Sequence, residues 1–175
     1  MEAVARGWLV GVFALALVTP ALAQESKSAA LAKELTDALD KAKSSTVAAK
    51  DPSQPDVFVA AMYLPGTLLV VSAKFAAPAA MNAIVAKKDY QEAYVDIQSA
   101  SDPATKVFVQ DQGADGLKMK TFDGFDTAKG SVSFDGDWKK AKAASEQDYQ
   151  KSFTDADEQY AKMLTTLLAA IKKPS

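Results

Sequence analysis

Residues 57–74 constrain the fold more than any other stretch of the chain. They form two runs rich in β-branched and aromatic residues, Val57–Leu64 and Thr67–Lys74, on either side of Pro65-Gly66. Runs of this kind around a Pro-Gly pair are typical of a β-hairpin. Both runs are apolar at almost every position, whereas a strand with one wet face alternates polar with apolar residues. The sequence therefore predicts two central strands in a sheet that is covered on both faces.

A second strand pair is predicted at residues 90–100 and 106–112, which are joined by a segment that contains Asp-Pro. In the first of these runs the more apolar residues Ala93, Val95 and Ile97 occupy alternate positions. A period of two is expected for a strand with one face toward the core and one toward water. This pair is therefore expected at a more peripheral position in the sheet.

An amphipathic helix is predicted for residues 26–43. Leu31, Leu35 and Leu39 recur there four residues apart, with charged residues between them. This spacing produces a helix with a narrow apolar stripe, which we expect to pack against the sheet. Residues 44–55 are rich in Ser, Asp and Pro and are interpreted as a loop or linker.

The last third of the chain has the strongest helical pattern. Its apolar stripe consists of Tyr149, Phe153, Ala156, Tyr160, Met163, Leu164, Leu167, Leu168 and Ile171. Ser145 and Thr154 each begin a segment with acids in the first turn, so the region forms either one long helix or two. We expect it to cover one face of the central strands, with the helix at residues 26–43 beside it or on the opposite face.

The remaining segments are shorter. Pro78 precedes a predicted short helix at residues 79–87, and Gly and Asp dominate residues 113–136. The Gly-rich part is expected to form irregular loops with one short strand at residues 131–134. The elements together predict an α+β domain. Its antiparallel or mixed sheet of about four to five strands packs against an N-terminal helix and a long C-terminal helix.

The first residues have the layout of a secretory signal peptide. Arg6 precedes an apolar run at residues 8–18, and Pro20 is followed by Ala21-Leu22-Ala23. This layout predicts cleavage after Ala23. The alternative is an uncleaved membrane anchor, but a spanning helix needs about 20 apolar residues and this run is shorter.

Three segments follow from these assignments. They are a signal peptide at residues 1–23, an N-terminal helix and linker at residues 24–50, and an α+β domain at residues 51–175 that is continuous with the helix. The part after residue 23 has the length of one domain with its own core. No stable membrane anchor would remain after cleavage, so the protein is expected to be soluble and either periplasmic or secreted. The chain has no cysteine, so its stability must come from packing rather than disulfides.

Composition excludes several classes of function. The chain has no histidine and no cysteine, which excludes the Ser-His-Asp triad and zinc sites built on these residues. A formal net charge of -2 at pH 7 argues against a general nucleic-acid binder, which needs a concentrated basic face. An enzyme would have to use Asp and Lys or a bound flavin. Ser72 and Lys74 could share a strand face, but any Ser-x-Lys segment does so.

Acids and aromatic residues crowd the Gly-rich region and its neighbours. The acids are Asp111, Asp115, Asp123, Asp126, Asp135 and Asp137, and the aromatics are Phe122, Phe125, Phe134 and Trp138. Carboxylates alone would suit Ca²⁺, but the spacing does not match a helix-loop-helix calcium site, so solvated loop acids are favoured. The aromatic rings either cover the core or line a pocket. If a pocket exists, its predicted ligand-binding residues are Lys106, Asp111, Phe122, Asp123, Phe125, Asp135 and Trp138.

Three functional hypotheses follow, and the sequence identifies no particular cofactor or partner. The first is a non-enzymatic exported domain that binds a small molecule or a protein partner in the cell envelope. The second is an enzyme that uses Asp and Lys or a flavin-type cofactor. The third is an envelope structural or assembly factor that acts through the C-terminal helix.

Overall fold

The computed structural model describes residues 26–75, 83–84, 86, 90–102, 104–119 and 123–172. The strands are β1 (Thr46–Lys50), β2 (Val57–Leu64), β3 (Thr67–Lys74), β4 (Val107–Gln112), β5 (Gly124–Thr127) and β6 (Gly130–Ser133). They form one 6-stranded antiparallel sheet in the order β1-β2-β3-β4-β5-β6. The helices are α1 (Lys27–Ala42), α3 (Tyr90–Ala100) and α4 (Glu146–Ile171). The α+β class is confirmed, with slightly more strands than expected.

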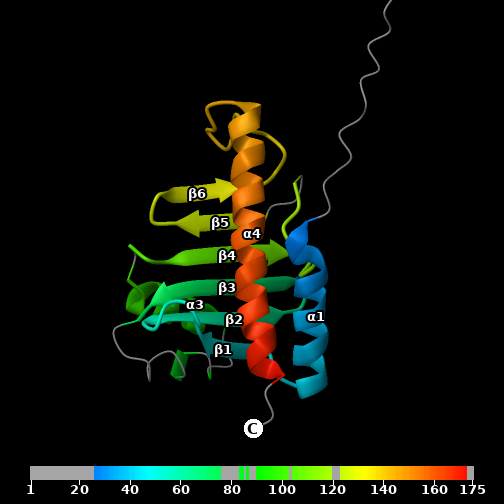
Figure 1. Cartoon of the computed structure of the whole chain (residues 1–175), viewed down its shortest axis with the longest axis vertical. Coiled ribbons are helices and arrows are strands. Elements are labelled where there is room, and N and C mark those ends of the chain that lie inside the picture. Colours follow the sequence, from blue (N-terminus) through cyan, green and yellow to red (C-terminus); the bar gives the residue numbers. More distant parts are fainter. Residues whose placement is uncertain are drawn as a thin grey trace, which may run out of the picture.

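The two terminal helices lie side by side on one face of the sheet, where α4 crosses the strands (Figure 1). The core on that face includes Val59 and Ala61 of β2 together with Leu164 of α4. The intervening residues of β2 point to the opposite face, where Ala60 belongs to a second cluster with Ile97 of α3. Both faces of the central strands are therefore covered, as the unbroken apolar runs predict.

The predicted central hairpin is confirmed. Leu64 of β2 pairs with Thr67 of β3 across the turn. Gly66 in that turn has a positive φ of 78°, a conformation that glycine adopts without the steric cost of a Cβ. This hairpin pairs with β1 on one side and β4 on the other.

The prediction of a strand at residues 90–100 is wrong, because Tyr90–Ala100 forms helix α3. The apolar alternation at Ala93, Val95 and Ile97 also fits a helix, since Tyr90, Ala93 and Ile97 are spaced by three and four residues. Ile97 is buried, whereas Val95 is 58% exposed, which is the pattern of a one-sided helix. The second predicted strand of this pair is confirmed as β4, whose partners are β3 and β5.

Two strands form in segments that the sequence predicts as loops. Residues 44–55 contain β1, which pairs with β2 through Thr46↔Met62 to Lys50↔Phe58. In the Gly-rich region the short strand predicted at residues 131–134 corresponds to β6, but β5 was not expected. The signal peptide at residues 1–23 and most of the helix predicted at residues 79–87 lie outside the described residues.

The C-terminal segment is a single helix, α4. The Ser145 hydroxyl oxygen accepts a hydrogen bond from the Asp148 N–H at 3.1 Å and caps the first turn. Thr154 lies inside this continuous helix and does not begin a second one. Its hydroxyl donates to the Gln150 carbonyl one turn earlier. The buried stripe confirms that α4 covers the sheet, and α1 lies beside it rather than on the opposite face.

None of the described helices has both the length and the apolar character needed to cross a membrane.

Candidate functional site

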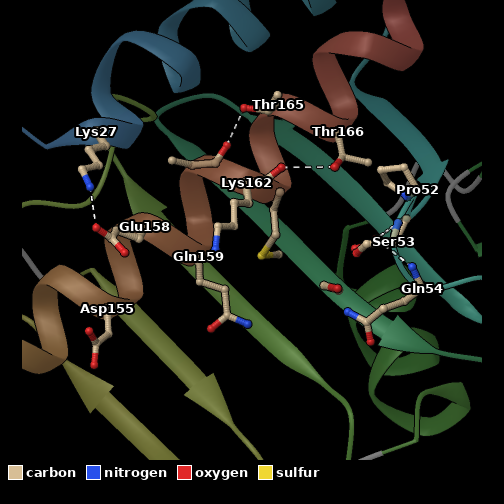
Figure 2. Close-up of a pocket in the computed structure, with 14 residues that line it drawn as sticks. Lys27, Pro52, Ser53, Gln54, Asp155, Glu158, Gln159, Lys162, Thr165 and Thr166 are labelled. Atoms are coloured by element: carbon tan, nitrogen blue, oxygen red, sulfur yellow. Dashed lines mark hydrogen bonds and ion pairs between the residues drawn. The ribbon is translucent and has the colours of Figure 1, made fainter.

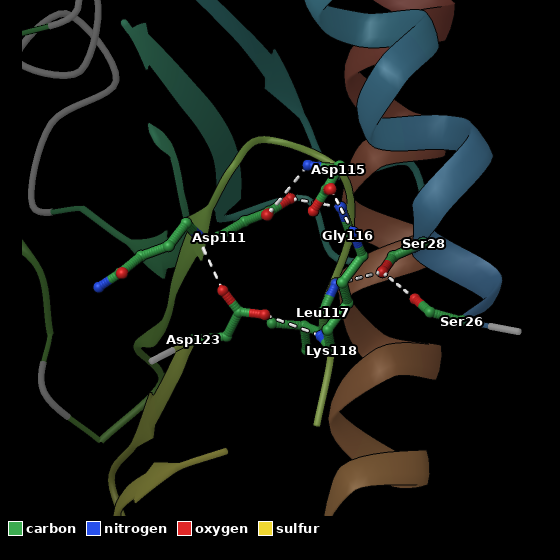
Figure 3. Close-up of polar contacts among 9 residues, drawn as sticks. Ser26, Ser28, Asp111, Asp115, Gly116, Leu117, Lys118 and Asp123 are labelled. Carbon is green, nitrogen blue, oxygen red and sulfur yellow. Dashed lines mark hydrogen bonds and ion pairs between the residues drawn. The ribbon is translucent and has the colours of Figure 1, made fainter. Parts of the chain in front are cut away.

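A buried polar network joins α1, α4 and the segment between β4 and β5. Figure 3 shows the part of it around Ser28, Asp111 and Asp123. Its acids are Asp111, Asp123 and Asp157, whose exposed fractions are 0%, 0% and 5%. Burying a carboxylate is costly unless hydrogen bonds replace its water. The partners of each acid therefore decide whether the network is structural or available to a ligand.

Asp157 of α4 binds the beginning of α1. Its carboxylate accepts hydrogen bonds from the N–H groups of Lys27 at 2.6 Å and Ser28 at 3.1 Å. The hydroxyls of Ser26 and Ser28 also donate to it, each at 2.6 Å. The N–H groups of a first helical turn have no partner within the helix and favour a negative charge. Asp157 thus caps α1 from another helix.

Asp111 at the end of β4 holds the chain that returns toward β5. It accepts hydrogen bonds from the N–H groups of Asp115 at 3.2 Å and Gly116 at 2.9 Å, and from the Tyr160 hydroxyl at 2.9 Å. Burial raises the pKa of Asp111 to about 6, opposed by the Gly116 and Tyr160 hydrogen bonds and reinforced by the charge of Asp123. Burial and the neighbouring Asp111 also raise the pKa of Tyr160 well above its usual value.

The carboxylate of Asp123 is also bonded to backbone groups. Asp123 accepts from the N–H groups of Gln112 at 2.8 Å and Lys118 at 2.7 Å. The Leu117 N–H donates to the Ser28 hydroxyl at 2.9 Å, which ties this segment to α1. Among the described residues no group of acids could hold a metal ion. The network therefore fixes the fold rather than presenting groups to a ligand.

The structure separates the predicted ligand-binding residues. Lys106 precedes β4, whereas Asp111 lies near the end of that strand, and Asp111 and Asp123 come together within the network. Asp135 follows β6, where it accepts from the Asp137 N–H at 3.0 Å and faces Lys140 at 3.7 Å. Phe122 lies outside the described residues.

The predicted aromatic residues that the structure describes pack in or against the core. Phe125 is buried, and Trp138 packs against the core on the face of the sheet that α4 covers, with part of its surface exposed. Phe134 is fully buried, with ring centroids 5.2 Å from Phe153 and 5.9 Å from Tyr149. These rings therefore belong to the core or its edge and do not line a pocket.

A groove of about 910 Å³ runs between the polar side of α4 and the loop that joins β1 to β2 (Figure 2). Residues 51–54 form one wall and residues of α4 from Asp155 to Thr166 form the other, with Ser72 of β3 and Lys27 of α1 also contributing. Met163 lines it as well and belongs to the core. None of the six predicted residues that the structure describes lines this groove.

The acids of the groove already have partners. Asp51 accepts hydrogen bonds from the Ser53 N–H at 2.7 Å, the Ser53 hydroxyl at 2.6 Å and the Gln54 N–H at 3.1 Å. Asp155 pairs with Lys151 at 2.5 Å. Glu158 pairs with Lys27 of α1, which also fixes one end of the groove.

Several other polar groups of the groove have no such partner. The side chains of Gln54, Ser72, Gln159 and Lys162 form no hydrogen bond or ion pair with another described residue. Gln54 and Gln159 project toward the space between the two walls, with Lys162 beside Gln159 (Figure 2). The groove therefore offers amide, hydroxyl and ammonium groups that remain available to a bound molecule.

Sequence reasoning missed this groove because its walls are about a hundred residues apart in the chain. The polar side of α4 could be identified from positions that fall off the apolar stripe, such as Lys162 and Thr165. Which loop faces that side depends on how α4 crosses the sheet, and no local pattern encodes that crossing. Comparisons of the chain with protein-family models, with curated proteins and with solved structures find no match.

Proposed function

We propose that this protein is an exported, non-enzymatic domain that binds a small molecule or a protein partner in the groove between α4 and the β1–β2 loop. The observation that carries the proposal is the groove of about 910 Å³ with uncommitted polar side chains on both walls. Ligand sites in proteins typically measure about 300 to 1,000 Å³ and use a few convergent polar groups. The groove matches that description in size and in the placement of Gln54, Gln159 and Lys162.

The chemistry of the described residues favours binding over catalysis. Asp111, whose pKa is raised to about 6 by burial, is bonded to two N–H groups and to Tyr160 in the interior and is not among the residues that line the groove. Ser72 lines the groove, but Lys74 pairs with Asp56 at 3.5 Å instead of with the Ser72 hydroxyl. A serine needs an adjacent base to become a nucleophile. These contacts support a groove that holds a molecule without reacting with it.

Export is part of the proposal and is supported by the sequence of residues 1–23. The basic residue, the apolar run and the Ala21-Leu22-Ala23 pattern together resemble a secretory leader. The periplasm or the medium is therefore the proposed location. The mass of the protein purified from each fraction of its native host tests this, since a chain beginning at Gln24 is expected outside the cytoplasm. A full-length chain confined to the cytoplasm would contradict export.

A structural role through the apolar stripe of α4 is less well supported. Tyr160, Leu164 and Leu167 of that stripe are fully buried against the protein's own core. An apolar stripe that is buried in this way is not available to a partner helix. Any partner of α4 would have to bind its polar side, which is the wall of the groove.

Binding in the groove can be tested by nuclear magnetic resonance. The isotope-labelled protein would be titrated with the small-molecule and peptide fraction of an envelope extract. We expect the side-chain amide signals of Gln54 and Gln159 to shift, and the shifts to weaken in Gln159→Ala. Lys33→Ala is the matched control, because Lys33 is an exposed helical residue paired only with Asp37. Shifts confined to residues outside the groove, or no shifts, would overturn the proposed site.

A further inference from the structure

We infer that the groove binds an uncharged peptide segment in an extended conformation, held through its backbone N–H and C=O groups by the side-chain amides of Gln54 and Gln159. This inference rests on the proposed function and names the class of ligand for the same groove. It follows from two features of the lining residues. Their unpaired charges cancel, and their free polar groups include both donors and acceptors.

The charged residues of the groove leave one charge of each sign unpaired. The acids and lysines that line it are Asp51, Asp155, Glu158, Lys27 and Lys162. Glu158 pairs with Lys27, and Asp155 pairs with Lys151. Asp51 on the loop wall and Lys162 on the α4 wall form no ion pair with another described residue. A charged ligand would be attracted to one of these two and repelled by the other, so the groove favours a ligand with no net charge.

The free polar groups of the groove are of both kinds. One carboxylate oxygen of Asp51 accepts three hydrogen bonds from its own loop, and the other accepts none from the described residues. The hydroxyls of Thr165 and Thr166 donate to helix carbonyls at 2.8 Å and 3.2 Å, so they can only accept from a ligand. The Lys162 ammonium can only donate. A ligand that both donates and accepts therefore satisfies more of these groups than a ligand of one kind.

The two glutamines of the groove identify an amide as the best match. Neither side-chain amide bonds to another described residue, and both project toward the space between the walls (Figure 2). Each carries a carbonyl acceptor beside an NH₂ donor. In an extended chain the N–H and C=O of one residue point to the same side, which is how paired strands exchange two hydrogen bonds. Gln54 and Gln159 can thus each bind one residue of a peptide from opposite walls.

The apolar part of the lining is small. Among the described lining residues it consists of Pro52, Ala161 and Met163, and Met163 is only 5% exposed. Sites for apolar small molecules are lined mainly by hydrophobic and aromatic side chains. No aromatic ring is among the described residues that line this groove. The lining therefore suits a polar chain with small side chains better than an apolar or aromatic molecule.

Titration with matched probes tests the amide assignment. The isotope-labelled protein would be titrated with acetyl-tetra-alanine amide, which is uncharged and carries both N–H and C=O groups. The matched probe is the same peptide methylated at every amide nitrogen, which keeps the carbonyls and removes the donors. We expect the unmethylated peptide to shift the Gln54 and Gln159 side-chain signals to saturation. The methylated peptide should bind at least about tenfold more weakly, because it loses several hydrogen bonds.

Three further probes separate the other classes of ligand. Glutarate represents anions, putrescine represents cations and trehalose represents uncharged polyols. Each should bind more weakly than the unmethylated peptide. Tighter binding of any of the three, or equal binding of the two peptides, would overturn the assignment to an uncharged peptide. No shift of groove signals with any probe would also overturn it, whereas the extract titration decides separately whether the groove binds at all.

Substitution of Gln159 supplies the second arm. Gln159→Met removes the amide but keeps a long side chain that favours a helix, and a well-dispersed spectrum should show that the variant folds. We expect its affinity for the unmethylated peptide to fall by about two- to tenfold. Gln150→Met is the matched control, since Gln150 is exposed on the same helix and is not among the groove residues. It should bind as the wild type does, and a Gln159→Met variant that also binds equally well would overturn the inference.

Discussion

The Asp157 carboxylate on α4 accepts hydrogen bonds from both the N–H and the hydroxyl of Ser28, near the beginning of α1. The two residues are separated by most of the chain, and their contact fixes the end of one helix against the side of the other. Ser26, which occupies the N-cap position of α1, does not cap the helix with its own side chain. It donates to Asp157 instead. Capping of α1 therefore depends on tertiary structure.

Removal of Asp157 should destabilise the protein strongly. Asp157→Ala leaves the N–H groups of Lys27 and Ser28 without their acceptor in a buried setting, which should lower the free energy of unfolding by about 2 to 4 kcal/mol. Asp155→Ala is the matched control, because Asp155 lies on the same helix and its ion pair with Lys151 is exposed. The control should cost less than about 1 kcal/mol. Urea unfolding measures both, and equal losses would show that the cap contributes little.

The pKa of Asp111 predicts how stability changes with pH. Burial raises it from 3.8 to about 6, so between these values the folded protein binds more protons than the unfolded chain. This group therefore makes the protein less stable as the pH rises from about 4 to about 6, by roughly 2 to 3 kcal/mol.

The comparison of wild type with Asp111→Asn isolates this contribution. Other titrating groups are shared by both proteins and cancel in the difference. The free energy of unfolding of the wild type should rise relative to that of the variant as the pH is lowered from 7 to 4. A difference that stays constant across urea titrations at pH 4, 5, 6 and 7 would show that Asp111 ionises as readily in the folded protein as in the unfolded chain.

The central hairpin could be predicted from the sequence because local signals agree there. Pro65-Gly66 marks the turn, and the runs on either side are apolar on both faces. The segment of α3 was predicted as a strand because Ala93, Val95 and Ile97 follow a period of two. The same segment also fits a helix, since Tyr90, Ala93 and Ile97 have helical spacing. Tertiary packing, which places Ile97 in the second core cluster, decides between the two.

The candidate sites were harder to predict than the fold. Asp111 and Asp123 were among six acids for which the sequence favoured solvated loop positions, but both are fully buried. Their partners are backbone N–H groups, whose position depends on how the chain returns from β4. The groove combines residues 51–54 with the polar side of α4, and neither part contains a recognisable motif. Long-range contacts create both features, so single-sequence patterns carry little information about them.

The two sides of α4 should differ sharply in their tolerance of substitution. Leu164 is fully buried in the main core, whereas Lys162 is exposed on the groove wall. Leu164→Ala should cost about 2 to 5 kcal/mol because it leaves a cavity, and Lys162→Ala should change stability by less than about 0.5 kcal/mol. Guanidinium unfolding of the two variants checks this. Equal and small effects would mean that α4 does not pack on the sheet in solution.

The approach of Gly116 to α1 provides a test of the network geometry itself. A Cβ at Gly116 would lie 2.4 Å from the Ala29 Cα, and the φ of Gly116 is +87°. Gly66 has a similar φ of +78°, but a Cβ there would meet nothing within 4 Å. Gly66→Ala therefore measures the backbone cost alone, about 1 to 2 kcal/mol. Gly116→Ala adds a clash with backbone and must shift the segment that donates to Asp111, so it should cost at least about 2 kcal/mol more. Thermal and urea unfolding of the pair would measure the difference, and similar losses would show that α1 and this segment are not in close contact.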